Sequence, residues 1–565
     1  MVRVASLLVA AFLVSESAFS QQTVVIQASP GAPAQPAPAR DTTAKTGTAR
    51  IRGHVVAAEN GAPLRRAQVR ATSSEFRENR VTATDEKGAF EFKDLPAGRY
   101  NISASKGSFV SLQYGQTRAF EGGKPLEVPD GQTVEKIDFV LPRGSVITGR
   151  VVDEYGEPAA DVQVASMRSQ FVQGRRRLVP TGRFASTNDI GEFRLFGLPP
   201  GQYYLSAMMR NFSFGDSDER TGYAQTYYPG TASPAEAQRI KVDLGQSVSD
   251  VNMTLITERT SRISGSVADS QGRPVAMGNV MAMPRGGSGM FFGPSANAQI
   301  KPDGTFTISG VAPGDYSLRA NVGFSASGDV EFAVADVTAS GDDISGVHLM
   351  TSKMVTATGR VVAQDAAAAQ LLRLPIRLFT TAVNPDDSMM MMGGGGGVVK
   401  DDFTFELKVS PGKFRLTAQP APGWALRAVR HNGIDVTDSG LEFTAGGDAS
   451  GIEVELTNHP SDLSGLVTNS RGELARDYTV MVFSQDRDQW SGNSRYRGGG
   501  RPDQDGRFEI RALPAGKYYA IALDYVDSGE AGDPELLERI HTKATAFSIN
   551  DGETKTLDLK LQTAS

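Results

Sequence analysis

The sequence predicts an all-β chain of five tandem seven-stranded antiparallel β-sandwich domains. Three observations support this prediction. Short segments in which apolar and polar residues alternate recur along the chain, one set of motifs occurs five times, and turn residues are abundant, with 61 Gly and 29 Pro among 565 residues. No stretch carries a sustained helical period. We therefore expect a row of small sandwiches rather than one large core.

The composition argues against several classes of function. The 58 Lys and Arg residues nearly balance the 64 Asp and Glu residues, and a formal net charge of −6 does not indicate nucleic acid as a partner. The chain has no Cys, so it has no disulfide, no Cys-ligated zinc and no thiol nucleophile.

The N-terminus resembles an export signal. Arg3 precedes the apolar run 4–14, and small residues at 18–20 suit signal peptidase, so we expect a signal peptide over 1–20 and a disordered Pro/Ala-rich tether over 21–47. The alternative is an N-terminal anchor, but a bilayer core needs ~20 apolar residues. No later segment qualifies either. We expect an exported protein, periplasmic or extracellular, without a transmembrane segment.

A pentapeptide of apolar residue, any residue, Gly, any residue and Val opens each repeat. It occurs at 51–55, 147–151, 263–267, 357–361 and 463–467. The spacing suits tandem domains rather than a solenoid. We place five domains, called copies one to five, at 48–142, 143–257, 258–352, 353–458 (degenerate) and 459–565. Joined by short linkers, they should form an elongated monomer.

Further shared motifs follow in the same order in each copy. In copy one they are Gly61-x-Pro63, Thr84-Asp85-x-x-Gly88-x-Phe90 and Leu95-Pro96-x-Gly98-x-Tyr100. Alternation after the polar turn places Phe90 and Phe92 on one buried face. The aromatic after the last Gly resembles the tyrosine corner of sandwich domains in four copies, and copy four has Phe414 instead. Copy four also lacks the first turn and the Gly before Phe403.

These motifs resemble the carboxypeptidase regulatory-like domain, over residues 48 to about 563. The resemblance implies a transthyretin-like or immunoglobulin-like sandwich, grouped with carbohydrate-binding-like folds and found in bacterial secreted and envelope proteins. Modules of this family accompany the zinc domain of some carboxypeptidases and do not hydrolyse peptides themselves. The name therefore does not imply peptidase activity.

We find no catalytic, cofactor-binding or metal-binding residue. The five His residues are scattered, and none begins a His-x-x-Glu or His-Glu-x-x-His pattern. Residues 286–290 miss the spacing of a serine nucleophile elbow. Residues 501–509 superficially resemble part of a calcium loop, but Arg501 and Ala512 occupy its end positions, so we interpret the segment as the polar turn of the repeat.

Loops of differing length and composition lie between the first turn and the polar turn, where binding usually varies. They include 173–177, 286–293, 389–392 with the following glycines, and 490–501. The candidates for stacking on sugar rings are Trp490 with Tyr496, and Tyr227 with Tyr228. The alternative for each pair is packing within the protein. Loop drift without function is the alternative for the loops.

The leading hypothesis is a non-catalytic exported binding and spacer protein that contacts carbohydrate or envelope polymer. A second hypothesis is a periplasmic or cell-surface protein-interaction scaffold that pairs its edge strands with a partner. A third is an accessory domain array of an envelope enzyme. Solvent-exposed Trp490 or Tyr227 would favour sugar binding, whereas buried rings would favour the scaffold.

Overall fold

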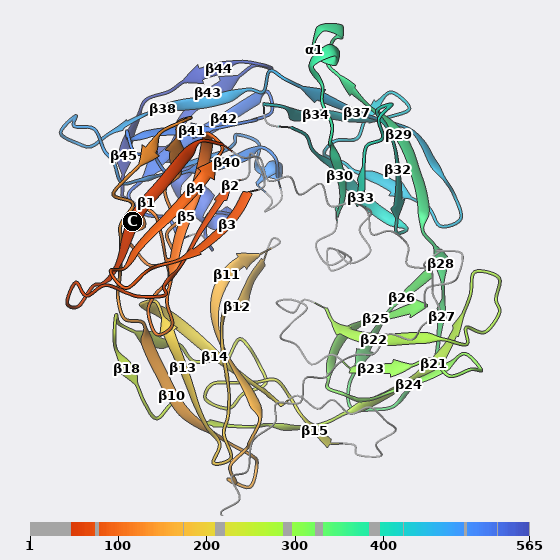
Figure 1. Cartoon of the computed structure of the whole chain (residues 1–565). Coiled ribbons are helices and arrows are strands. Elements are labelled where there is room, and N and C mark those ends of the chain that lie inside the picture. Colours follow the sequence, from red (N-terminus) through yellow and green to blue (C-terminus); the bar gives the residue numbers. More distant parts are fainter. Residues whose placement is uncertain are drawn as a thin grey trace, which may run out of the picture. The chain divides into compact units, whose positions relative to one another are not determined.

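The computed structural model describes residues 47–73, 78–172, 175–209, 221–285, 296–322, 331–383, 396–421, 423–490, 494–527 and 529–563. The expected signal peptide, the expected tether up to residue 46, and the loops at 286–293 and 389–392 lie outside these ranges. Strands make up most of the described chain (Figure 1), which confirms the all-β class. Across the described ranges, no helix is long and apolar enough to cross a membrane.

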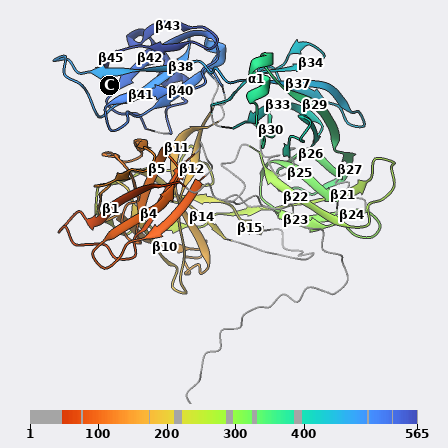
Figure 2. The same cartoon turned by 45° about the horizontal axis from the view of Figure 1, so that its top comes forward.

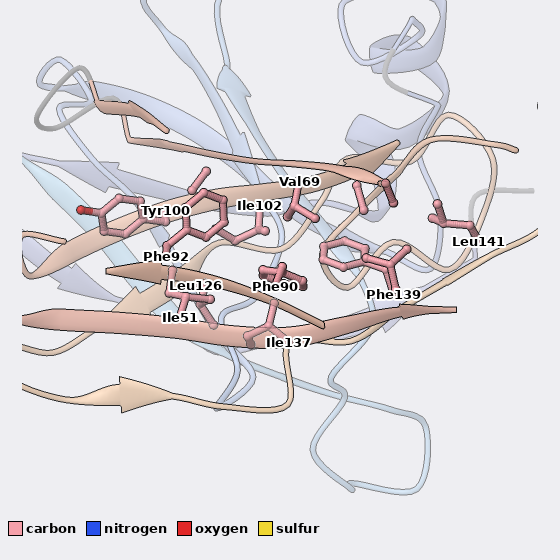
Figure 3. Packing of buried hydrophobic residues seen from close by; sticks show 14 of the residues in the cluster. Ile51, Val69, Phe90, Phe92, Tyr100, Ile102, Leu126, Ile137, Phe139 and Leu141 are labelled. Carbon is pink, nitrogen blue, oxygen red and sulfur yellow. The ribbon is translucent and has the colours of Figure 1, made fainter. Parts of the chain in front are cut away.

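Copy one forms two sheets with one core between them. Its strands are β1 (Ala49–Ala57), β2 (Gln68–Ser73), β3 (Glu78–Ala83), β4 (Ala89–Leu95), β5 (Gly98–Ser105), β6 (Leu112–Gln113), β7 (Leu126–Val128), β8 (Thr133–Val134) and β9 (Phe139–Leu141). β4, β1, β8 and β9 form one sheet, and β3, β2, β5, β6 and β7 form the other. Their inward side chains, among them Ile51, Phe90 and Tyr100, pack together (Figure 3).

Copy two repeats this plan, and its second and third strands are longer than those of copy one. They are β10 (Ser145–Val152), β11 (Val162–Val172), β12 (Arg175–Ser186), β13 (Glu192–Leu198), β14 (Gly201–Met209), β15 (Thr221–Tyr223), β16 (Thr226–Tyr227), β17 (Ile240–Val242), β18 (Ser247–Val248), β19 (Met253–Thr254) and β20 (Thr257–Arg259). β11 and β12 pair over their whole length as a long antiparallel hairpin (Figure 2). β20 pairs with β15 and crosses the boundary expected after residue 257.

Copy three contains a three-stranded and a five-stranded sheet. Its strands are β21 (Ser261–Ala268), β22 (Gly278–Pro284), β23 (Ala296–Gln299), β24 (Thr305–Val311), β25 (Gly314–Val322), β26 (Glu331–Ala339), β27 (Ile344–Met350) and β28 (Ser352–Lys353). β28 completes the larger sheet by pairing with β26, although it crosses the boundary expected after residue 352.

Copy four keeps the two sheets and adds one short helix. Its elements are β29 (Val355–Ala363), α1 (Ala366–Leu371), β30 (Arg377–Ala382), β31 (Gly396–Val398), β32 (Thr404–Val409), β33 (Gly412–Gln419), β34 (Ala425–His431), β35 (Ile434–Asp435), β36 (Leu441–Phe443) and β37 (Ala449–Thr457). The polar turn survives without its glycine, because Phe403 itself adopts a left-handed φ of 62°.

Copy five carries a second hydrophobic layer. Its elements are β38 (Asp462–Thr468), β39 (Thr479–Ser484), the 3-10 turn η2 (Arg487–Gln489), β40 (Arg497–Gly500), β41 (Arg507–Ile510), β42 (Gly516–Leu523), α2 (Pro534–Ile540), the 3-10 turn η3 (His541–Lys543), β43 (Thr545–Ile549), β44 (Thr554–Thr556) and β45 (Leu559–Gln562). Leu536, Leu537 and Ile540 of α2 pack against the outer face of β39 and β42. This layer lies apart from the sandwich core.

The first and last strands of each copy run in parallel. The pairs are β1 with β8 and β9, β10 with β18 and β19, β21 with β27, β29 with β37, and β38 with β44 and β45. The sheet that contains the first strand of each copy is therefore mixed, which corrects the expectation of antiparallel pairing there, whereas the second sheet of copies one to four is antiparallel throughout. Period-two alternation reports which face a residue occupies and is the same for both strand directions, so the sequence could not reveal this pairing.

The glycine of the opening pentapeptide lets the first strand of each copy pair closely with the last strands. A Cβ placed on Gly53 would lie 1.9 Å from the carbonyl oxygen of Ile137 and 3.0 Å from the ring of Phe90. Gly149, Gly265, Gly359 and Gly465 each face the matching backbone carbonyl at 1.9 to 2.1 Å. Because the approaching atom is backbone, a side chain has no room at this position. The pentapeptide is thus a packing signature of the two terminal strands.

The tyrosine corner is present in copies one, two and five. The hydroxyl groups of Tyr100, Tyr203 and Tyr518 each donate to the carbonyl of the Pro four residues earlier, at 2.8, 2.6 and 2.7 Å. Burial raises the pKa of Tyr203 and of Tyr518 well above the usual range for a phenol. The hydrogen bond lets a buried aromatic side chain satisfy its polar end while it fixes the turn before the strand.

Candidate functional site

Trp490 is a core residue of copy five. Its side chain is 5% exposed, its ring lies edge-on to Phe483 with centroids 5.6 Å apart, and its Nε1 donates to the carbonyl of Ser484 at 2.7 Å. It belongs to the layer under α2. The indole therefore has neither an open face nor a spare donor with which to contact a sugar.

Tyr496 is half-buried and engaged by its neighbours. Its ring stacks on Tyr518 with centroids 6.4 Å apart, and its hydroxyl donates to Asp438 at 3.1 Å. Arg495 binds the same carboxylate through Nε and Nη2 at 2.8 and 3.0 Å. Burial raises the pKa of Tyr496. Trp490 and Tyr496 thus lie in different hydrophobic clusters and do not form one platform.

Tyr227 and Tyr228 pack against other residues of copy two. Tyr227 is 8% exposed and packs with Met167 and Tyr204, and burial raises its pKa. Tyr228 packs partly against the sandwich core and donates its backbone N–H to Leu205 at 3.0 Å. None of the four aromatic candidates is an open stacking face in this conformation, and their contact with carbohydrate remains a prediction.

The segment 501–509 forms the polar turn of the repeat. Asp503 Oδ1 accepts the backbone N–H groups of Asp505 and Arg507 at 3.0 and 2.9 Å. Asp85 binds Lys87 and Ala89 in the same way in copy one. The structural interpretation of this segment is confirmed. In the described ranges, no three His, Asp or Glu side chains gather in a group that could hold a metal ion.

A shallow pocket of about 420 Å³ lies where copy one meets copy five. Copy one lines it with Tyr114 and the neighbouring Gln113, and copy five with Arg476, Asp503 and Gln504. Burial raises the pKa of Tyr114 above its ordinary value of 10.0, and a phenol is already protonated at neutral pH at that ordinary value. A neutral phenol beside amide and charged groups can bind a polar ligand by hydrogen bonds.

A charged cluster lies on β34 and β37 of copy four. Glu455 binds both Arg427 and Arg430, and Arg427 also binds Asp551 of copy five with 2.8 Å between Nη2 and Oδ2. Burial acts to raise the pKa of Glu455, but the hydrogen bonds from Arg430 and Arg427 outweigh it and hold the pKa below its ordinary value. The cluster is an ion-pair network that joins β34 to β37 and copy four to copy five.

Sequence reasoning missed the residues that join distant copies. Glu121 of copy one and Arg501 of copy five form an ion pair with 2.5 Å between Oε2 and Nη1, and their side chains are 0% and 3% exposed. The sequence analysis places Arg501 at the end of a variable loop and at a position where a calcium loop would need a carboxylate, and neither placement predicts this ion pair. No local pattern marks such a pair, because each residue is ordinary within its own copy.

The comparisons with known proteins agree with the motif analysis. The family model of the carboxypeptidase regulatory-like domain matches residues 50–142 and again residues 262–352. The chain contains carboxypeptidase regulatory-like domains. These matches fall on copies one and three. For copies two, four and five the family stays an expectation from their motifs. No curated protein matches the chain.

Solved structures similar to this chain include a Bacillus anthracis protein and two pilus proteins. The Bacillus anthracis TIE protein is 13% identical over 69% of this chain and 68% of its own, with a TM-score of 0.15. A Streptococcal ancillary pilin is 15% identical over 54% of this chain and 98% of its own, with a TM-score of 0.20. The RrgB pilus protein from Streptococcus pneumoniae is 10% identical over 74% of this chain and 98% of its own, with a TM-score of 0.15. TM-scores this low carry no argument about function.

Proposed function

We propose that this chain is a non-catalytic exported scaffold that contacts a protein partner of the bacterial envelope through its edge strands. The burial of the aromatic candidates supports the proposal most directly. Trp490 and Tyr227, whose exposure would favour sugar binding, are 5% and 8% exposed and complete hydrophobic clusters instead. Their loops therefore build the domains, and the surfaces left for recognition are strand edges and sheet faces.

The edge strands offer the hydrogen-bonding groups that such a partner needs. β3 ends the larger sheet of copy one, with β2 on its inner side. Val81 at its centre is 49% exposed. An edge strand presents a row of backbone donors and acceptors that can extend a sheet into another protein.

Photo-crosslinking in the producing cells tests the scaffold. A photoreactive residue at Val81 should give a discrete crosslinked product, because a pairing strand would lie beside it. The same residue at Tyr155, in a turn and 83% exposed, is the control and should give none. Equal products from both positions, or none from Val81, would contradict pairing at this edge.

Carbohydrate or envelope-polymer binding is the second candidate, and the pocket around Tyr114 is the observation in its favour. A glycan array with the mature chain separates the two functions. The scaffold predicts no specific binding by the wild type. Glycan binding lost in Tyr114→Ala or Tyr496→Ala, but kept in Tyr155→Ala, would establish the carbohydrate function.

A further inference from the structure

A loop of copy one inserts a buried charge against copy five. Glu121 Oε2 accepts the backbone N–H groups of Thr117 and Arg118 in its own loop, at 3.1 and 3.2 Å, which aims the carboxylate at Arg501. Arg501 also binds Asp477 and donates to the carbonyl of Gly122 at 3.1 Å. The guanidinium thus joins both copies in one hydrogen-bonded group.

Further contacts surround this ion pair. Thr117 donates to Asp477 at 3.0 Å, and Lys124 Nζ donates to the carbonyl of Arg476 at 2.5 Å. Tyr525 of copy five donates its hydroxyl to the carbonyl of Ala119 at 3.0 Å. The contacts link residues about 350 to 410 positions apart in the sequence, which adjacency along the chain does not explain.

The long hairpin of copy two reaches the same copy. Arg168 on β11 binds Asp527, and both side chains are 13% exposed. Arg176 on β12 binds Asp533, which is 1% exposed, with 2.5 Å between Nη2 and Oδ2. The backbone N–H of Phe171 donates to the carbonyl of Gly529 at 3.1 Å. The extension of β11 and β12 beyond the sandwich therefore has a partner.

The charges on the two sides are complementary. Copies one and two contribute mainly cations, and copy five contributes mainly carboxylates. The pairs include Arg118 with Asp524, Lys124 with Asp477, Arg168 with Asp527, and Arg176 with Asp533. The pair of Glu121 with Arg501 has the opposite polarity. Complementary charges fix the register of an interface and steer its formation.

We propose that copies one and two form a docking surface whose partner is copy five of the same chain, held by ion pairs as a salt-sensitive clasp. Hydrogen bonding at this contact is incomplete, because Glu121 Oε1, Arg168 Nη1 and Arg501 Nε are buried without a hydrogen-bond partner in the described structure. Unsatisfied buried polar atoms reduce the net gain of an interface. Salt also weakens the more exposed pairs, such as Arg118 with Asp524. The clasp can therefore open.

A designed disulfide tests the clasp cleanly, because the natural chain has no Cys. A Cβ placed on Gly529 would lie 2.7 Å from Cγ of Gln170, so the two positions are close enough to bridge after small adjustments. The full-length double variant Gln170→Cys with Gly529→Cys should form an intrachain disulfide at low salt. Oxidation should slow at least several-fold in 1 M NaCl. Non-reducing electrophoresis and peptide mass spectrometry would measure the disulfide.

Two further substitutions in this double-cysteine background locate the cause. Arg501→Gln removes the buried cation and should also slow oxidation several-fold. Arg360→Gln removes an exposed ion pair with Glu453 inside copy four and should leave the rate unchanged. The single variants Gln170→Cys and Gly529→Cys cannot form the intrachain bond and control for nonspecific dimers.

The remaining outcomes would overturn the proposal. Only interchain dimers in the double variant would show that the surface binds a second chain instead of its own copy five. The absence of any disulfide at low salt would show that the contact does not form. If neither 1 M NaCl nor Arg501→Gln changes the oxidation rate of the double-cysteine variant, ion pairs do not hold copy five against copies one and two.

Discussion

One glycine per copy allows the first strand to approach the backbone near the last strand closely. The carbonyl oxygen of Ile137 lies so close to Gly53 that a methyl group on Gly53 would clash with it. Since backbone atoms cannot swing aside as a flexible side chain can, a larger residue must push β1 away from the last strands or distort the core.

Gly53→Ala should destabilise copy one by about 1–3 kcal/mol through overpacking. That loss would lower the melting temperature of this domain by several degrees. Gly107→Ala is the matched control, because a Cβ at Gly107 would meet no atom within 4 Å. Calorimetry of the full chain with hydrogen exchange in β1 measures the effect. Equal stability of the two variants would show that β1 and the last strands can move apart to accommodate a methyl group at little cost.

Trp490→Ala should destabilise copy five by about 3–5 kcal/mol, as expected for a large buried ring. Trp490→Phe keeps most of the packing and loses the hydrogen bond to Ser484, so it should cost about 1 kcal/mol or somewhat more. Thermal unfolding followed by calorimetry measures both losses, with Tyr155→Ala as an exposed control. A stable Trp490→Ala variant would contradict the core role of the indole.

The sequence predicted core residues better than it predicted the aromatic candidates. Phe90 and Tyr100 follow from alternation and from the Gly turn, which are local patterns, and both are buried. The burial of Trp490 depends on α2, about 45 residues further along, whose side chains cover it. No window around Trp490 contains that information.

At the level of elements, β34 and β37 show how charge supports a strand pair. Glu455 lies opposite Ala428 in their ladder and binds arginines on either side of it. Its side chain is 9% exposed, so protonation would leave two arginines without their shared partner.

Acid should weaken this strand pair. The pKa of Glu455 is lower in the folded protein than its ordinary 4.5, so its contribution to stability is present above about pH 4.5 and is lost as the pH falls through the folded value. Glu455→Gln should lower stability at neutral pH and flatten its dependence between pH 5 and 3. Melting temperatures over this range measure the effect. Glu453→Gln is a control on the same strand, and an equal response of both variants would contradict the assignment.

Element positions followed from turn and alternation signals, with two informative exceptions. Phe403 holds the left-handed turn position that Gly occupies in the other copies, so a missing glycine did not mean a missing turn. The helix α2 is seven residues long, too short for a helical period to emerge. Asp533 before Pro534 was its detectable signal, because Asp533 caps the helix through the N–H of Glu535.

At the scale of the whole molecule, the contacts of copy five with copies one and two are the feature that the sequence could not predict. They depend on how domains far apart in the chain meet, and no periodicity records that. A row of separate domains in extended order would not bring Glu121 to Arg501.

Hydrogen exchange should report this contact directly. Arg501→Gln should speed exchange of the backbone amides in residues 112–124, because their partner surface is lost, while amides of β29 and β37 in copy four should be unchanged. Mass spectrometry of the full chain at low salt measures both regions. Faster exchange in both regions would indicate general destabilisation, and unchanged exchange in 112–124 would show that copy five does not protect this loop.

The parallel pairing of first and last strands has a mechanical consequence. In copy one, Val55 to Ala57 of β1 lie beside Phe139 to Leu141 of β9. The chain enters the ladder at the start of β1 and leaves it at the end of β9, so tension on the two ends pulls neighbouring strands past each other. Their hydrogen bonds are then loaded together in shear instead of opening one by one. A tandem array of such modules would resist stretching.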